Sequence, residues 1–253
     1  MGAQKQHGFT IIEVLLFIAI SGGLLAALLV GVNGSIEQQR YRDSVTSLAS
    51  FMQSQYDKAL NTSNSRSSSL NCDAAGIVSA AGTQPGTTDC LIIGRLITGD
   101  QNGVSLRSTD IIAYVVDSNA FEEKSDVDSL RTSGVVKLML AGGADASLWD
   151  EYTPEWGAKS MPLDATGAAF GSGGKFAMAI IRSPKNGSMM TFIGNGASEN
   201  IQDELISAEG LKNPLTLCVE PDGFAAPQKR AIVIAPNTIS PAGVSTKAGV
   251  AGC

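Results

Sequence analysis

Glu13 is the residue of this chain whose surroundings in the sequence most clearly call for chemistry. It is the only charged side chain in the apolar run of residues 9–32, which is close to the roughly 20 residues that a helix needs to cross a hydrocarbon core. A carboxylate there costs about 2.5 to 3.5 kcal/mol on insertion scales and is usually paired. Either Glu13 extends to the lipid headgroups, or it pairs with a cation at the same depth. A cut between Gly8 and Phe9 would create an α-amine that supplies this cation.

Other motifs that suggest catalysis are incomplete. The segment GSGGKF at residues 171–176 is similar to a phosphate-binding loop, but its lysine is followed by Phe176 and Ala169 replaces the first glycine, so we interpret it as a turn. SDVDSL at residues 125–130 lacks the glycine and the final glutamate of a calcium loop and is interpreted as a solvated acidic turn. The one histidine, His7, would be lost with the leader, which removes Ser-His and Cys-His nucleophile schemes. We expect no enzyme and no cofactor.

Charge and cysteine content exclude further classes. The formal net charge is −6, which disfavours a general electrostatic grip on nucleic acid. The best basic run, QKR at residues 228–230, is small. The four cysteines contain no C-x-x-C pair, which disfavours zinc, and their even number favours two disulfides with three possible pairings.

The segment GFTIIEVL at residues 8–15 follows a short polar leader and opens an apolar helix. It closely resembles the class III signal of type IV pilins and type II secretion pseudopilins. The resemblance implies that a prepilin peptidase cuts between Gly8 and Phe9 and N-methylates Phe9. It also implies that Glu13 pairs with the terminal amine of a neighbouring subunit as a filament grows. The chain departs from many pilins in having no proline before Pro85.

The resemblance implies a domain organisation and a set of partners. Residues 1–8 form the prepilin leader peptide, residues 9–60 the N-terminal helix, and residues 61–253 a β-rich globular head. The helix divides into a transmembrane and assembly half (9–34) and an amphipathic half (35–60). The implied partners are other pilin subunits, the prepilin peptidase, the membrane platform of the pilus machine and, before assembly, the lipid bilayer. The implied location is the cytoplasmic membrane, single-pass with the head outside the cytoplasm, and then a cell-surface or periplasmic filament.

The expected function is that of a minor pilin or pseudopilin, a structural subunit of a type IV pilus or type II secretion-like filament. The alternative is a pilin-like DNA-binding or adhesive receptor of a competence or attachment pilus, for which DNA would need a larger basic face. A third interpretation, a single-pass protein that keeps its N-terminus, makes the glutamate match a coincidence. Charge alone leaves the orientation open, because Lys5 lies on one side of the run and Arg40 and Arg42 on the other.

Periodicity predicts that one helix continues from Phe9 to Leu60. Ser35 and Gln38 match a capping box that would start a second helix, but we favour continuity. The glycines of the run are either weak points or sites of close helix packing. They are Gly22, Gly23, Gly31 and Gly34. Beyond them an apolar seam recurs at steps of three and four residues and should pack on the head: Tyr41, Val45, Leu48, Met52, Tyr56 and Ala59.

Short apolar, β-branched segments separated by turn residues predict the head. The seven expected strands are residues 90–97, 111–116, 135–140, 176–181, 189–194, 215–220 and 231–235, and residues 198–209 read as a short helix capped by Ser198. The fold class is therefore α+β and, from the resemblance, pilin-like: a long N-terminal helix packed on a mainly antiparallel β-sheet head.

Among the three cysteine pairings we favour Cys72 with Cys90 and Cys218 with Cys253. The first would close a flexible stretch rich in Gly, Ala and Thr, and the second would anchor a C-terminal tail that would otherwise fray. The second bridge also resembles the C-terminal disulfide loop of many pilins. Closing each loop could contribute roughly 3 to 4 kcal/mol in the chain-entropy model.

Overall fold

The computed structural model describes most of the head and nearly all of the N-terminal helix. The described residues are 10–61, 71–73, 76–78, 90–100, 102–141, 149–164, 166–168, 175–195, 201–221 and 228–253. Gly8 and Phe9, at the predicted cleavage site, lie outside them, and so do most of the expected loop after the helix and the GSGG part of the phosphate-loop-like segment.

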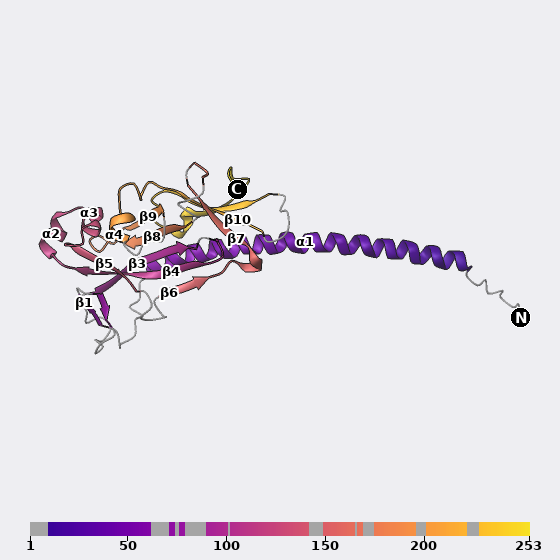
Figure 1. The fold of residues 1–253 in the computed structure, drawn as a ribbon, viewed down its shortest axis with the longest axis horizontal. Coiled ribbons are helices and arrows are strands. Elements are labelled where there is room, and N and C mark those ends of the chain that lie inside the picture. Colours follow the sequence, from indigo (N-terminus) through magenta and orange to yellow (C-terminus); the bar gives the residue numbers. More distant parts are fainter. Residues whose placement is uncertain are drawn as a thin grey trace, which may run out of the picture.

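One helix dominates the molecule and projects from one end of the head (Figure 1). The helix α1 (Ile11–Leu60) has 50 residues and is continuous, about 75 Å at 1.5 Å per residue. Ser35 lies inside it and donates a hydrogen bond from Oγ to the carbonyl of Gly31 at 3.1 Å, so it caps no second helix. The predicted continuity is confirmed. The first helical residue is Ile11, after the N-cap Thr10.

The head contains a six-stranded antiparallel sheet. Its order is β5 (Val136–Leu140), β4 (Leu106–Val115), β3 (Cys90–Gly99), β8 (Phe176–Arg182) and β9 (Met189–Asn195), and β6 (Trp149–Tyr152) pairs with β4 beside β5. A bulge interrupts β3 between Ile92 and Gly94. A Cβ at Gly94 would lie 2.1 Å from the carbonyl oxygen of Ile180, so glycine lets β3 and β8 approach closely at the bulge.

A second, four-stranded antiparallel sheet has the order β12-β11-β10-β7. These strands are β12 (Val244–Ala248), β11 (Arg230–Ile234), β10 (Leu215–Glu220) and β7 (Lys159–Leu163). A small hairpin joins β1 (Asn71–Asp73) and β2 (Gly76–Val78). All seven predicted strands are therefore present, while β1, β2, β6, β7 and β12 were not predicted.

Short helices complete the described head, and two of them correct predictions. The expected acidic turn at residues 125–130 is instead a helix, α3 (Asp126–Arg131), because the Ser125 hydroxyl accepts from the backbone N of Asp128. The helix expected over residues 198–209 is shorter, α4 (Ile201–Glu204), and Ser198 lies outside the described residues. The others are α2 (Ser118–Glu123) and the 3-10 turns η2 (Glu155–Gly157) and η3 (Pro241–Gly243).

Two large apolar clusters and a small one around Ile112 lie in the described head. In one large cluster, the predicted seam of α1 packs against residues of both sheets, including Ile97, Met178, Leu217 and Ile232. All six residues of the seam are buried, which confirms the predicted packing of this half of the helix. In the other large cluster, α2, α3 and α4 cover the opposite face of the six-stranded sheet. The six-stranded sheet is thus buried on both faces, and α1 is the element shared by the two sheets.

Candidate functional site

The projecting half of α1 begins with a capping box built from Thr10 and Glu13. The backbone N and the Oγ1 of Thr10 each donate to Glu13 Oε2 at 3.0 Å, and the backbone N of Glu13 donates to Thr10 Oγ1 at 3.3 Å. These contacts use the charge of Glu13 to satisfy donors at the start of the helix. They also hold its carboxylate at the tip of the projecting helix.

The apolar side chains that follow have no packing partner in the described part of the chain. The helix is long and apolar enough to span a membrane, and none of its most apolar stretch is buried. A Cβ added at any of the four glycines of this half would meet nothing within 4 Å. Close packing at these glycines therefore requires a partner other than the described residues of this chain. The exposed large apolar residues include Ile11, Leu15, Phe17, Leu24, Leu28 and Val32.

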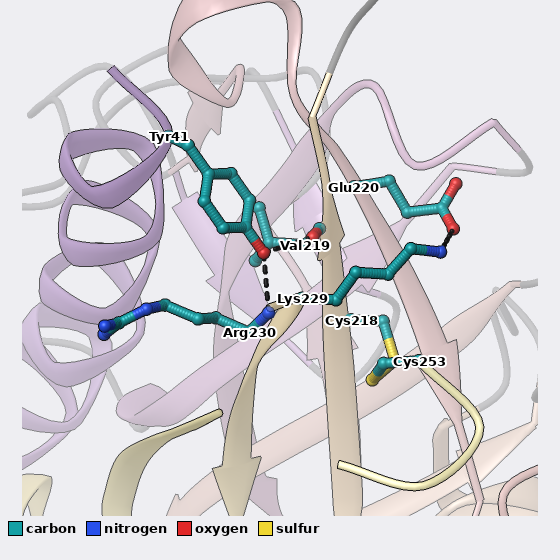
Figure 2. The surroundings of a disulfide bond; sticks show 7 residues. All are labelled: Tyr41, Cys218, Val219, Glu220, Lys229, Arg230 and Cys253. Atoms are coloured by element: carbon teal, nitrogen blue, oxygen red, sulfur yellow. Dashed lines mark hydrogen bonds and ion pairs between the residues drawn. A yellow bond between two sulfur atoms is a disulfide. The ribbon is translucent and has the colours of Figure 1, made fainter. Parts of the chain in front are cut away.

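The other half of α1 is fixed to the four-stranded sheet by a tyrosine hydroxyl (Figure 2). Tyr41 OH accepts from the backbone N of Arg230 at 2.6 Å and donates to the carbonyl of Val219 at 2.9 Å. The ring is buried, and burial raises the pKa of Tyr41 above its ordinary value. The phenol therefore joins the ends of β10 and β11 to the point where α1 leaves the head.

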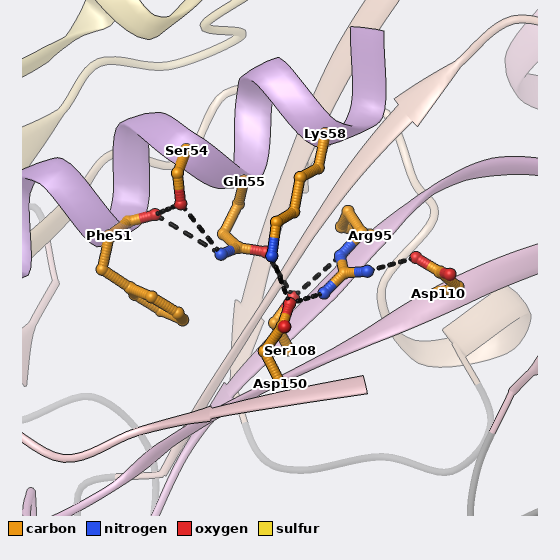
Figure 3. A network of polar contacts seen from close by, with 8 residues as sticks. All are labelled: Phe51, Ser54, Gln55, Lys58, Arg95, Ser108, Asp110 and Asp150. Atoms are coloured by element: carbon orange, nitrogen blue, oxygen red, sulfur yellow. Dashed lines mark hydrogen bonds and ion pairs between the residues drawn. The ribbon is translucent and has the colours of Figure 1, made fainter. Parts of the chain in front are cut away.

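A charged network fixes α1 to the six-stranded sheet (Figure 3). Arg95 of β3 is only 5% exposed; its Nε donates to Ser108 Oγ at 3.1 Å, and its guanidinium pairs with Asp110 and Asp150. Burial raises the pKa of Asp110 more than the neighbouring Arg95 lowers it. The cation therefore compensates two carboxylates, the buried one of Asp110 and the partly exposed one of Asp150.

Two residues of α1 reach this network. Ser108 Oγ donates to Gln55 Oε1 at 2.7 Å, and Lys58 Nζ pairs with Asp150 Oδ2 at 2.7 Å. Neither Arg95 nor Asp110 was predicted as a site residue from the sequence. The available signal was their position, because Arg95 interrupts the apolar segment CLIIGRLI and Asp110 directly precedes IIAYVV. A charge inside a buried strand needs a partner.

The structure joins Cys218 of β10 to Cys253 in a disulfide with a Cα–Cα distance of 5.5 Å (Figure 2). This is the pairing that the sequence analysis favoured, and it ties the last residue of the chain to the four-stranded sheet. Cys90 at the start of β3 is also disulfide-bonded. The side chain of Cys72, its predicted partner, lies outside the described residues.

The described residues thus define an α+β protein with a membrane-length helix that projects from a disulfide-bonded head. Over the same ranges, no group of three or more His, Cys, Asp or Glu side chains is arranged to hold a metal ion. Comparisons with protein-family models, curated proteins and solved structures found no match to this chain.

Proposed function

We propose that this protein is a structural subunit of a membrane-assembled filament, a minor pilin or pseudopilin that a prepilin peptidase processes between Gly8 and Phe9. The observation that carries the proposal is the projecting half of α1, which is apolar, unpacked and continuous with a helix fixed in the head. Such a surface must be covered by lipid or by other protein. Before assembly the bilayer would cover this surface. In the filament core, neighbouring copies of the same helix would cover it.

Glu13 favours a filament over a plain membrane anchor. An anchor needs only apolar length, and a carboxylate near its end adds an insertion cost. Thr10 offers the carboxylate two neutral donors, which stabilise the helix start but leave the negative charge in place. In the proposed filament, the terminal amine of a neighbouring subunit supplies the opposite charge at the same depth. Glu13 is then tolerated in the membrane because assembly pairs it.

Mass spectrometry of the mature chain tests the processing step. We expect the protein from cells with an active prepilin peptidase to begin at Phe9, with or without an N-methyl group. Replacing Gly8 with aspartate should block the cut, since the resemblance places the cleavage after this glycine. An intact Met1 or Gly2 terminus in the assembled material would contradict the proposal.

Competition between variants tests the assembly step. Glu13→Gln keeps the shape of the side chain and removes its charge, so insertion and cleavage should continue while incorporation into filaments falls. A loss of about tenfold corresponds to about 1.4 kcal/mol of missing pairing. Ser21→Ala, a polar-to-apolar change in the same run, is the matched control and should incorporate normally. Equal amounts of Glu13→Gln and wild type in sheared filaments would contradict the pairing. Glu13 would then only extend to the lipid headgroups.

A polar hollow on the head favours a second candidate function, that of an adhesive receptor carried by such a filament. The hollow measures about 530 Å³ and lies at the turn between β3 and β4. In it the guanidinium of Arg107 stacks over the ring of Trp149 at 4.7 Å, and Asp100, Glu151 and Lys175 add charges of both signs. Trp149→Ala should reduce attachment of cells without changing filament incorporation. Unchanged attachment would remove this candidate.

A further inference from the structure

The end of the head from which α1 emerges has a balance of basic and acidic side chains unlike that of the whole chain. We name this end the base of the head. Tyr41 contacts the last residues of β10 and the first of β11 there, whereas Gln53 Nε2 reaches the carbonyl of Val244 toward the other end of the sheet. The four-stranded sheet therefore runs alongside α1, and the base is its end nearest the projecting helix (Figures 1 and 2).

Basic side chains outnumber acidic ones among the described residues of the base, although the whole chain carries a net charge of −6. One acidic residue, Glu220, already has a basic partner in Lys229 at 2.9 Å. The remaining charges are largely exposed to solvent. The basic residues are Arg40, Arg42, Lys159, Lys229, Arg230 and Lys247, and the acidic ones are Glu37, Asp43, Glu155 and Glu220.

An exposed tryptophan marks the same end. Trp156 in η2 is 56% exposed and has a φ of 59°, a left-handed backbone conformation that bulky residues rarely adopt. The guanidinium of Arg40 stacks over its ring at 4.8 Å. Beside this pair lies a hollow of about 320 Å³. It is also lined by Ser44, whose hydroxyl is buried and has no hydrogen-bond partner among the described residues.

The base lies just beyond the layer of lipid headgroups when the apolar run fills the hydrocarbon core. Arg40 is eight residues beyond Val32, about 12 Å along a helix. A headgroup layer is about 5 to 7 Å thick on each side of the core. Long side chains and the usual tilt of about 20° in membrane helices close the remaining gap on one side of the head.

We propose that the base of the head is a docking surface for an anionic phospholipid bilayer. The inference rests on the proposed membrane insertion of α1 and adds a second membrane contact, made by the head before assembly. Trp156 lies at the interface, where tryptophan side chains are enriched. The basic side chains face lipid phosphates, whose negative surface potential attracts them. The hollow beside Arg40 gives a headgroup a place to enter, with the Ser44 hydroxyl on its wall.

The two tryptophans provide a matched pair of reporters for this contact. In Trp149→Phe, Trp156 is the only indole, and in Trp156→Phe only Trp149 remains. Trp149 precedes Asp150, which pairs with Lys58 of α1, whereas Trp156 contacts Arg40 of α1. Because Arg40 and Lys58 are 18 residues apart, the two tryptophans lie about 27 Å apart along the helix axis. The full chain is inserted in vesicles of phosphatidylcholine, with or without about 30 mol% phosphatidylglycerol, that carry a nitroxide on some headgroups.

We expect the nitroxide to quench Trp156 at least about twofold more in the anionic vesicles than in the neutral ones at low salt. The difference should shrink in about 1 M salt, where the screening length falls to about 3 Å. Trp149 should be quenched equally in both vesicles. Changing Arg40 and Arg42 together to glutamine should weaken the quenching of Trp156 in the anionic vesicles. Equal quenching of the two reporters under all conditions would overturn the proposal.

Hydrogen exchange of residues 153–160 in the unmodified chain provides a second measurement that needs no substitution. Slower exchange in anionic than in neutral vesicles is expected, and identical exchange would also overturn the docking surface. Failure of this inference is distinguishable from failure of the proposed function. A chain that inserts and enters filaments but shows no quenching difference lacks the docking surface. A chain that docks but never enters filaments lacks the assembly role.

Discussion

The two halves of α1 belong to one continuous helix, yet their apolar side chains have opposite surroundings. Between Ile11 and Val32 the large apolar residues are exposed, while between Tyr41 and Ala59 the predicted seam is buried against both sheets. The C-terminal half has its partner in the same chain. The N-terminal half has none among the described residues. Apolar residues occur in both halves, so their presence alone does not distinguish the halves. The C-terminal half differs in carrying polar residues between its apolar ones.

The charges of the two halves differ in the same way. Gln55 and Lys58 reach a network in which Arg95 compensates Asp110 and Asp150 inside the head. Among the described residues, Glu13 accepts hydrogen bonds only from the neutral donors of Thr10. The buried half thus has charged partners within the head. Substitutions that act on only one half of α1 test this difference.

Removal of Arg95 should have the largest effect on the stability of the head. Arg95→Met leaves Asp110 buried without its cation, and breaking a buried ion pair in this way typically costs about 3 to 5 kcal/mol. The loss should be smaller in acid, because an uncompensated Asp110 can take up a proton there. Urea unfolding of the full chain in detergent micelles, followed by fluorescence, measures the free energy of unfolding.

Lys58→Met is the control for this experiment. Lys58 pairs with Asp150, but its side chain is 47% exposed, and exposed ion pairs contribute about 0 to 1 kcal/mol. Its effect should therefore stay within about 1 kcal/mol at any pH. If Arg95→Met unfolds at the same urea concentration as Lys58→Met, the network does not fix α1 to the sheet.

A matched pair of leucines tests the comparison of the two halves directly. Leu48 is 0% exposed and Leu24 is 62% exposed in the same helix. Leu48→Ala should lower the free energy of unfolding of the head by about 3 kcal/mol through lost burial and the cavity left behind. Leu24→Ala should leave it unchanged and should instead weaken membrane insertion. The same urea titration, with carbonate extraction of membranes for insertion, measures both. A comparable loss from Leu24→Ala would mean that the projecting half also packs on the head.

Much of this architecture was predictable because it depends on local pattern. The three-four spacing of the seam fixed which face of α1 is buried, and β-branched apolar runs located the seven predicted strands. The strands that escaped prediction are polar or interrupted. β12 is VSTKA, β6 is WDEY and β7 contains Pro162. Their pairing is decided by neighbours already in place, which sequence pattern does not encode.

The candidate site was predictable only where its chemistry is local. Glu13 stands out because a charge in an apolar run is anomalous by itself. Trp156 and Arg40 do not, because their contact joins positions more than 100 residues apart in the sequence. Arg95 and Asp150 are also distant in the sequence, and they meet only through the pairing of β3, β4 and β6. The tip of α1 was therefore predictable from the sequence, whereas the base of the head was not.

Tyr56 offers the smallest and most specific test of the buried half. Its hydroxyl contacts Thr191 Oγ1 at 3.2 Å. Since the Thr191 hydroxyl donates to the carbonyl of Thr238, Tyr56 is left as the donor. Tyr56→Phe removes this hydrogen bond and should cost about 1 kcal/mol at neutral pH.

The pH dependence gives that small loss a distinctive signature. Burial raises the pKa of Tyr56 from its ordinary value of about 10 to about 12. The folded head therefore holds the phenol neutral at pH values where the unfolded chain ionises it. This contribution is fully present below pH 10 and is lost as the pH rises through about 12. The stability of the wild type should consequently fall to that of Tyr56→Phe and then below it over this interval in a series of urea titrations, because a pKa shift of this size corresponds to about 2.7 kcal/mol. If the free energies of unfolding of the two proteins instead change in parallel from pH 8 to about 12, Tyr56 ionises as freely in the folded head as in the unfolded chain. This part of α1 would then be less tightly buried than the structure shows.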